Sequence, residues 1–263
     1  PPFAPPPKPT SWRAPVAILA VAAVLVAAIL GYGWWSRQRA PAAPPPPAPV
    51  AAAPDASVPD SAPAVPVAQS DARVRELVGL LSPLPELQRW LASTEDLVRR
   101  FTSAVGNVAE GESPRAALSF LAPAGSFQTV SREGRLFIAP ESFARYDAVA
   151  RVVTSLDTRL SVITYHSLQP LLDGAFQEIS RPGQRFDQTL ANALARLVDT
   201  PVPEGELEVV DTPGVNFAFA APELEALTPA QKHLVRLGPA NARAVQAKLR
   251  ELRDALALPP PAP

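Results

Sequence analysis

The stretch LTPAQKHLVRLGPANARAVQAKLRELRDAL, residues 227–256, decides the fold of the C-terminal part of the chain. Thr228 followed by Pro229 is typical of a helix start, and Gly238 followed by Pro239 ends that helix and opens another. Apolar residues of the second helix recur at helical spacing and form one seam: Ala242, Val245, Leu249, Leu252 and Leu256. The stretch therefore predicts two helices that pack through their leucines around a tight turn.

Helical spacing of apolar residues also dominates the chain upstream of this stretch. We expect helices over residues 71–81, 85–92, 97–111, 140–156, 157–179 and 186–198. The residues that can cap three of them are Ser70 or Asp71, Ser93 with Asp96, and Asp157. The buried face of the helix over residues 97–111 is expected to hold Leu97, Phe101, Val105 and Val108. That of the helix over residues 157–179 is expected to hold Leu160, Ile163, Leu168, Leu171, Ala175 and Ile179. Pro170 lacks a backbone N–H and should kink the helix over residues 157–179.

Two short segments have strand-like composition instead. Residues 127–130 and 136–138 flank a turn with Gly134, and residues 206–210 and 215–220 flank a turn with Pro213 and Gly214. The two hairpins can pair into one small sheet. The sequence thus predicts an α+β fold, predominantly α-helical, in which a globular helical domain of residues 71–258 carries two small β-hairpins and is preceded by one transmembrane helix.

The predicted transmembrane helix is residues 14–36, 23 positions without a charge between Arg13 and Arg37. At about 1.5 Å per residue it extends roughly 34 Å, enough for a hydrocarbon core of about 30 Å. Trp34 and Trp35 at its end have amphipathic rings suited to the headgroup level. A cleaved signal peptide and a buried core helix are the alternatives, but no small-residue cleavage site directly follows the apolar run.

Proline-rich segments surround this helix and end the chain. Residues 1–13 form a Pro-rich tail, and residues 259–263 form another. Residues 37–70 hold ten prolines among alanine and valine, and we interpret them as a disordered tether. At about 3.1 Å per residue in polyproline II the tether reaches up to roughly 100 Å. A docking motif for aromatic grooves is the alternative interpretation.

Composition excludes several classes of function. The chain has no cysteine, which rules out disulfides, thiolate chemistry, iron–sulfur clusters and cysteine-ligated zinc. Of 24 basic and 25 acidic residues, 4 basic and 2 acidic lie in residues 1–70, so the remainder carries a formal charge of −3. A domain this close to neutrality is no general polyanion binder, and we expect no nucleic-acid partner.

No motif identifies a catalytic, metal or cofactor site. The two histidines, His166 and His233, have no metal-ligating residue at helical spacing. Paired carboxylates could cleave a glycan, and the pairs nearest in sequence are Glu141 with Asp147 and Glu223 with Glu225. Both Glu141 and Glu223 more simply suit the first turns of helices, where the helix dipole favours them. We therefore expect no enzyme, no cofactor and no metal.

The basic and aromatic residues are better candidates for contacts with a partner. The candidates for a protein or anion contact are Arg99, Arg100, Tyr146, Lys232, Arg236, Arg243, Lys248 and Arg250. The alternative is structural: solvated or paired charges on a helical hairpin, and a Tyr146 ring anchored in the core. An anion partner would be a phospholipid headgroup, a cell-wall polymer or an acidic protein. The two terminal helices also resemble a helix-turn-helix, but the basic excess is too small for DNA.

Four stretches carry a family resemblance: RRFTSAVGNVAEG (99–111), FARYDAVARVVTSLD (143–157), SLQPLLDGAFQEI (167–179) and, above all, residues 227–256. They resemble the bacterial domain-of-unknown-function family DUF3014, whose members typically have an N-terminal membrane span, a low-complexity linker and this domain. The resemblance covers nearly all of residues 71–256. It implies an envelope protein without established activity and brings no catalytic residues to this chain.

These observations predict a single-pass protein of the bacterial inner membrane. The basic residues Lys8 and Arg13 before the span balance Arg37 and Arg39 after it, so the charge rule does not orient the helix. A short tail, one span and a long tether favour a cytoplasmic N-terminus and a periplasmic C-terminal domain. We expect that domain to be a non-catalytic interaction module for an envelope protein or cell-wall polymer. A hydrolase with dispersed carboxylates and an anion-sensing domain are the alternatives.

Overall fold

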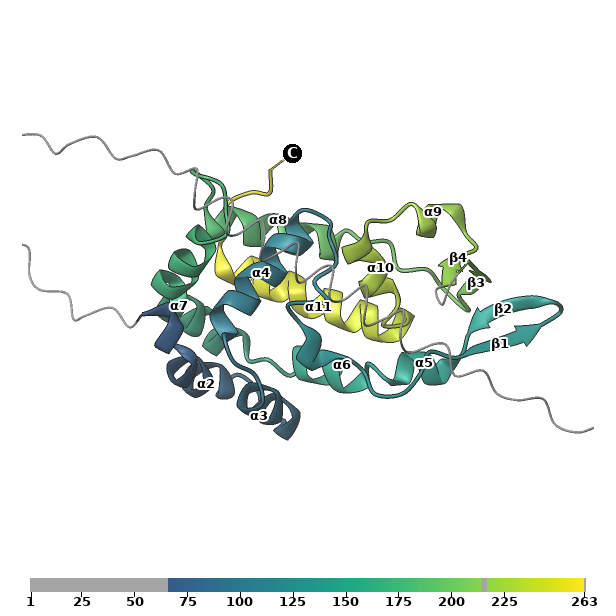
Figure 1. The fold of residues 1–263 in the computed structure, drawn as a ribbon, viewed down its shortest axis with the longest axis horizontal. Helices are drawn as coiled ribbons and strands as arrows, with labels where there is room; N and C mark the ends of the chain where they lie inside the picture. Colours follow the sequence, from purple (N-terminus) through teal and green to yellow (C-terminus); the bar gives the residue numbers. More distant parts are fainter. Residues whose placement is uncertain (1–65, 214–216, 263) are drawn as a thin grey trace, which may run out of the picture. The chain divides into compact units, whose positions relative to one another are not determined.

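The computed structural model describes residues 66–213 and 217–262 (Figure 1). Its α-helices are α2 (Asp71–Gly79), α3 (Pro85–Ala92), α4 (Leu97–Ala109), α5 (Pro140–Ala144), α6 (Asp147–Thr154), α7 (Thr158–Gln177), α8 (Phe186–Val198), α9 (Pro222–Glu225), α10 (Pro229–Val235) and α11 (Pro239–Leu256). Two 3-10 turns are η1 (Val67–Gln69) and η2 (Ser119–Leu121). The strands are β1 (Thr129–Arg132), β2 (Arg135–Ile138), β3 (Glu208–Asp211) and β4 (Phe217–Phe219).

The fold is α+β and mostly helical, as the sequence predicted. The predicted transmembrane helix and nearly all of the tether lie outside the described residues. Among the described helices, none combines the length and apolarity needed to cross a membrane. In Figure 1, α2, α3 and α7 lie toward one end of the described region and the sheet lies at the other.

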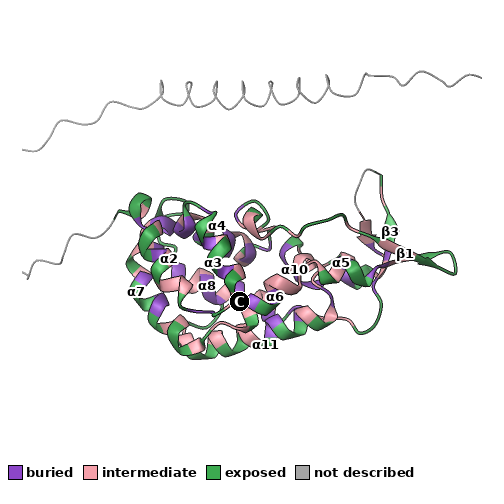
Figure 2. Cartoon of the chain, turned by 90° about the horizontal axis from the view of Figure 1, so that it is seen from below, coloured by how far each residue is buried: buried purple, intermediate pink, exposed green. Residues whose placement is uncertain are grey.

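Helices α4, α7, α8 and α11 form the body of the domain. Figure 2 shows that their buried residues face one another, while exposed residues cover the outside. Phe186 at the start of α8 is 1% exposed, and Ala175 of α7 and Ala242 of α11 are fully buried. These small residues let the helix backbones approach closely, and the large ring fills the remaining core volume. The apolar seam of α11 predicted a buried face, and Ala242 and Val245 confirm it.

The two hairpins form one antiparallel sheet in the order β1-β2-β3-β4. Glu133 and Gly134 make the first turn with φ of 52° and 76°, so Arg132 pairs with Arg135. This is the positive-φ geometry of a two-residue hairpin turn. Strand β2 joins the hairpins by pairing Leu136 with Val209. One face covers a second core cluster, made of Ile138, Leu207, Val209, Phe219, Leu224 and Val235.

The single helix expected over residues 140–156 is wrong, because the chain forms α5 and α6 with a break at Arg145 and Tyr146. The Tyr146 N–H donates to the Phe143 carbonyl at 2.9 Å, which closes a tight turn in place of a helical one. The Arg145 guanidinium donates to the Gly125 carbonyl at 2.9 Å. These bonds redirect the chain from the sheet to the helical body.

The predicted helix starts have mixed outcomes. Asp157 caps α7, as expected, by accepting the Leu160 N–H at 2.7 Å. Thr228 and Gln231 form a full capping box on α10. The capping box expected at Ser93 and Asp96 is wrong, because Asp96 adopts φ of 56° and its side chain caps nothing. The Asp71 carboxylate of α2 takes its place by accepting the backbone N–H groups at the start of α4.

Four apolar residues assigned to buried faces are exposed instead: Phe101 (44%), Leu160 (39%), Ile163 (52%) and Ile179 (56%). The buried face of α7 runs through Thr164, Leu168, Leu172 and Phe176. The elements that pack against α7 cover this one face. Apolar positions near both ends of the 20-residue helix stay uncovered. Pro170 lies inside α7, which remains one continuous helix.

Candidate functional site

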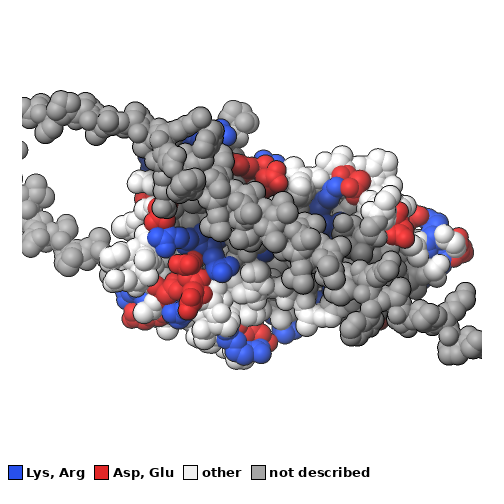
Figure 3. All heavy atoms as spheres, in the orientation of Figure 1, with Lys and Arg blue, Asp and Glu red and all other residues white. Residues whose placement is uncertain are grey.

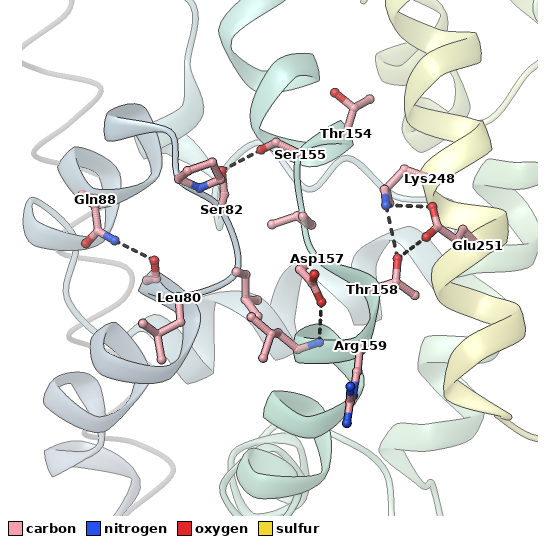
Figure 4. Close-up of a pocket in the computed structure, with 15 residues that line it drawn as sticks. Leu80, Ser82, Gln88, Thr154, Ser155, Asp157, Thr158, Arg159, Lys248 and Glu251 are labelled. Atoms are coloured by element: carbon pink, nitrogen blue, oxygen red, sulfur yellow. Dashed lines mark hydrogen bonds and ion pairs between the residues drawn. The ribbon is translucent and has the colours of Figure 1, made fainter.

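A groove of about 890 Å³ lies where the end of α2, the start of α7 and the middle of α11 meet (Figure 4). Its walls are residues 79–83 with Gln88, residues 154–160, and the pair Lys248 and Glu251. Each wall sits at an end or on a face of a helix, so the local capping of α2 and α7 decides the shape of the groove. It is open to solvent, and no aromatic residue is among the described residues that line it.

Hydrogen bonds hold the first two walls together. The Asp157 N–H donates to the Leu81 carbonyl at 2.8 Å, and the hydroxyls of Ser82 and Ser155 lie 2.6 Å apart. Ser82 is only 4% exposed, so its hydroxyl bond is well protected from solvent. The Gln88 amide donates to the Gly79 carbonyl at 2.7 Å, which satisfies a free carbonyl at the end of α2. The groove therefore has a fixed floor rather than a gap between independent segments.

The rim of the groove is apolar. Leu80 is 67% exposed, the most exposed of the large hydrophobic residues that the structure describes. Leu160 of α7 also lines the groove, and the exposed Ile163, which is outside the lining, lies one turn further along α7. Single exposed apolar residues are ordinary on protein surfaces. Leu80 and Leu160 differ from such single residues because both line the same groove.

Two of the four charged residues that line the groove, Lys248 and Glu251, are engaged with each other. Lys248 forms an ion pair with Glu251 at 2.7 Å and donates to the Thr158 hydroxyl at 3.2 Å. The bond from Lys248 holds the pKa of Glu251 below its usual range, with the Thr158 hydroxyl as the next cause. Arg159 differs from them: among the described residues it has no hydrogen-bond or ion-pair partner. In Figure 4 its side chain extends away from Lys248 and Glu251.

Of the eight residues predicted to contact a partner, Lys248 alone lines the groove. Arg99 donates twice to Glu178, at 2.6 and 3.0 Å. Arg100 donates to the carbonyls of Glu95 and Ala117. The ring of Tyr146 lies under the Arg145 guanidinium at 5.6 Å.

The other four are distributed along α10 and α11. Lys232 is paired with Glu225, and Arg236 donates to the Phe217 carbonyl at the sheet. Arg243 donates to the Pro203 carbonyl, and Arg250 donates to a carbonyl at the end of α8. The eight residues therefore do not form one basic patch. In Figure 3, acidic and basic side chains are interleaved on the visible face.

Ser113 and His233 form a close pair that sequence reasoning missed: their Oγ and Nε2 atoms lie 2.6 Å apart. The two residues are 120 positions apart, so no local motif could reveal them. Burial lowers the pKa of His233, and the charges of Arg236 and Arg115 lower it further. A neutral imidazole beside a hydroxyl can accept its proton, but neither residue is among the described residues that line the groove between α2, α7 and α11.

A second unpredicted cluster joins α7 to α8. The Tyr165 hydroxyl donates to Asp187, which also pairs with Arg185 at 3.3 Å. Burial and the charge of Asp187 raise the pKa of Asp173, while Arg185 opposes them. The carboxylate pairs considered from the sequence lie elsewhere: Asp147 accepts the Asn241 amide at 2.9 Å, and Glu225 is paired with Lys232. Among the described residues, no three His, Asp or Glu side chains are grouped for a metal ion.

Comparison with known proteins gives one match. The family described as "Protein of unknown function (DUF3014)" matches residues 97–253, more than half of the chain. The chain belongs to the DUF3014 family. No curated protein and no solved structure matches it.

The match places the groove partly outside the DUF3014 region. Residues 154–160, Lys248 and Glu251 lie inside the matched range, whereas residues 79–83 and Gln88 precede it. Helices α2 and α3 therefore contribute a wall, including the exposed Leu80, that the family match does not include.

Proposed function

We propose that this protein is a single-pass protein of the bacterial inner membrane and that its DUF3014 domain is a non-catalytic interaction module. The domain is held in the periplasm by the proline-rich tether and docks a protein or cell-wall partner. The groove between α2, α7 and α11 carries the proposal, because it combines a fixed floor with the exposed side chains of Leu80 and Leu160.

The anchored part of the proposal is supported by sequence. Residues 14–36 are long and apolar enough to span a bilayer, and the tether that follows gives a reach of up to roughly 100 Å. A domain with such a reach can meet a partner that lies outside its own membrane. Alkaline phosphatase and green fluorescent protein fused to the C-terminus should give an active phosphatase and a dark fluorophore. A bright fluorophore with inactive phosphatase would contradict the periplasmic placement.

The non-catalytic part is supported by the state of the carboxylates in the groove. Asp157 is occupied as the cap of α7, and the Lys248 ammonium keeps Glu251 ionised by lowering its pKa. A glycosidase needs one carboxylic acid with a raised pKa to protonate the leaving oxygen. The pKa of Glu251 is shifted in the opposite direction, and Asp157 is engaged as a helix cap, so the groove is better suited to holding a partner than to cleaving one.

The anion-sensing alternative is less well supported. It requires the basic residues of α10 and α11 to face one ligand. Lys232 and Arg236 instead contact residues of α9 and β4, whereas Arg250 contacts the end of α8.

Crosslinking and purification of the intact, anchored protein tests the proposal. The wild type should enrich a specific envelope component, and Leu80→Ser should lose it, because this change removes the most exposed apolar contact of the groove. Val210→Ser is the matched control: Val210 is 45% exposed on β3, at the opposite end of the described region (Figure 1). Recovery of only bulk membrane proteins, or the same component with Leu80→Ser, would contradict the proposal.

A further inference from the structure

We propose that the groove binds an extended peptide segment in which a carboxylate lies next to apolar side chains. The inference rests on the proposed function, since it names the chemistry of the partner for the same groove. Three properties of the groove carry it: one unpaired cation, an apolar rim, and a polar group with free hydrogen-bonding capacity.

The unpaired cation is Arg159, which has no hydrogen-bond or ion-pair partner within residues 66–213 and 217–262. The groove's other cation, Lys248, is already paired with Glu251, and Asp157 accepts a backbone N–H of its own helix. An acidic partner therefore adds a charge partner for Arg159 without displacing an existing ion pair. Guanidinium groups bind carboxylates through two parallel hydrogen bonds. These bonds select a negatively charged group and also fix its orientation. A basic or neutral partner would leave Arg159 uncompensated in the complex.

The apolar rim accounts for the side chains that flank the carboxylate. Leu160 and Ile163 lie one helical turn apart on α7, so their side chains are about 5–6 Å from each other. Alternate side chains of an extended peptide are about 6.6 Å apart, so two of them can contact this pair together. Leu80 faces the same groove from the other wall and is 67% exposed. Covering it removes apolar surface from water, which favours binding.

The polar group is the Gln88 side chain. Its Nε2 is bonded to the Gly79 carbonyl, and its Oε1 has no partner among the described residues. That oxygen can accept a backbone N–H from a bound peptide, and an extended backbone presents such groups at regular intervals. A sugar chain offers a poorer match, because its apolar faces stack on aromatic rings and the described lining contains none.

Peptide display against the full-length protein in nanodiscs tests the inference. A library of random dodecapeptides should yield binders in which Asp or Glu lies next to apolar residues. Arg159→Gln and Leu80→Ser should each weaken the selected peptides at least tenfold, and so should Glu→Gln or Asp→Asn in the peptide. Arg73→Gln is the control, because Arg73 is an exposed arginine of α2 outside the groove. It should leave binding unchanged.

Several outcomes would overturn the inference. These are a failure to select any Arg159-dependent peptide, binding that survives Leu80→Ser, and full displacement by millimolar inorganic phosphate, which would make Arg159 a simple anion site. Thermal unfolding of each variant shows whether it is folded, and both groove residues are exposed enough to be changed without loss of stability. If crosslinking recovers a Leu80-dependent partner but no acidic peptide binds, this inference alone fails and the proposed function stands.

Discussion

The carboxylate of Asp71 in α2 caps α4 by accepting two backbone N–H groups, from Asp96 and Leu97, each at 2.9 Å. The residue before α4, Asp96, has positive φ, so its own side chain provides no cap. One carboxylate thus satisfies two N–H groups that would otherwise lack partners, and its negative charge lies at the positive end of the helix dipole. The contact also fixes α2, which carries one wall of the groove, onto the body of the domain.

Removing this cap should destabilise the domain. Asp71→Ala is expected to lower the free energy of unfolding by about 1–2 kcal/mol, since it leaves both N–H groups without their acceptor. Urea denaturation followed by circular dichroism measures the change. Glu76→Gln is the control, because Glu76 makes only an exposed ion pair with Arg73 and should change stability by less than about 0.5 kcal/mol. Equal effects of the two variants would show that Asp71 caps nothing in solution.

The buried polar side chain of Gln246 should contribute to the stability of the domain. Gln246 is 4% exposed, and its amide donates to the carbonyls of Leu197 and Val198 at the end of α8 and of Thr200 just beyond it. Gln246→Leu is expected to cost about 2 kcal/mol, because buried carbonyls lose their donor. Ala244→Gln, an exposed change on α11, should be nearly neutral in the same urea titration. A stabilising Gln246→Leu would mean that the lost bonds are outweighed by apolar burial.

Gly238 should tolerate no side chain. It has φ of 89° and ψ of 154°, a conformation nearly restricted to glycine, and an added Cβ would lie 2.6 Å from the Phe143 ring. Gly238→Ala is expected to cost about 2–4 kcal/mol, from backbone strain together with the clash. Gly134→Ala separates the two causes, because Gly134 has φ of 76° with open space around it. It should cost only about 1–2 kcal/mol. Similar thermal midpoints for the two variants would contradict the close packing of Phe143.

His233 should make stability depend on pH. Burial lowers its pKa, so the folded protein keeps this imidazole neutral where the unfolded chain, with a pKa near 6.5, takes up a proton. The unfolded state then binds more protons, and stability is lost as pH falls through about 6.5 toward the folded pKa. His233→Gln should show a flatter pH dependence between about pH 7.5 and 5 in urea titrations. An equally steep pH dependence of stability in His233→Gln would contradict this assignment.

Local signals in the sequence predicted much of the fold. The positions of proline and glycine predicted α3 at Pro85–Ala92 and the start of α11 at Pro239. These residues restrict the backbone conformation of their immediate neighbours, so the signal is local. The turn at Gly134 likewise predicted the first hairpin. The cap on α4 was not predictable in this way, since Asp71 lies 26 residues before Leu97. The break at Tyr146 depends on a bond from Arg145 to Gly125, which no helical periodicity contains.

The groove was less accessible to prediction than the fold. Its walls come from residues 79–83 with Gln88, residues 154–160, and Lys248 with Glu251, and none of these sets carries a motif. Lys248 was predicted because of its charge, whereas Leu80 and Leu160 were assigned no functional role. Apolar spacing predicts which helix face is buried but not where the neighbouring elements stop, and their ends are what expose Leu160 and Ile163.

Site-specific photocrosslinking in living cells tests the central claim most directly. A benzophenone side chain placed at position 80 of the anchored protein should form an adduct of defined mass, and the adduct should disappear when Arg159→Gln is added. The same side chain at position 210 should form none. Adducts of equal yield at both positions, or none at position 80, would contradict the claim that this groove docks a partner.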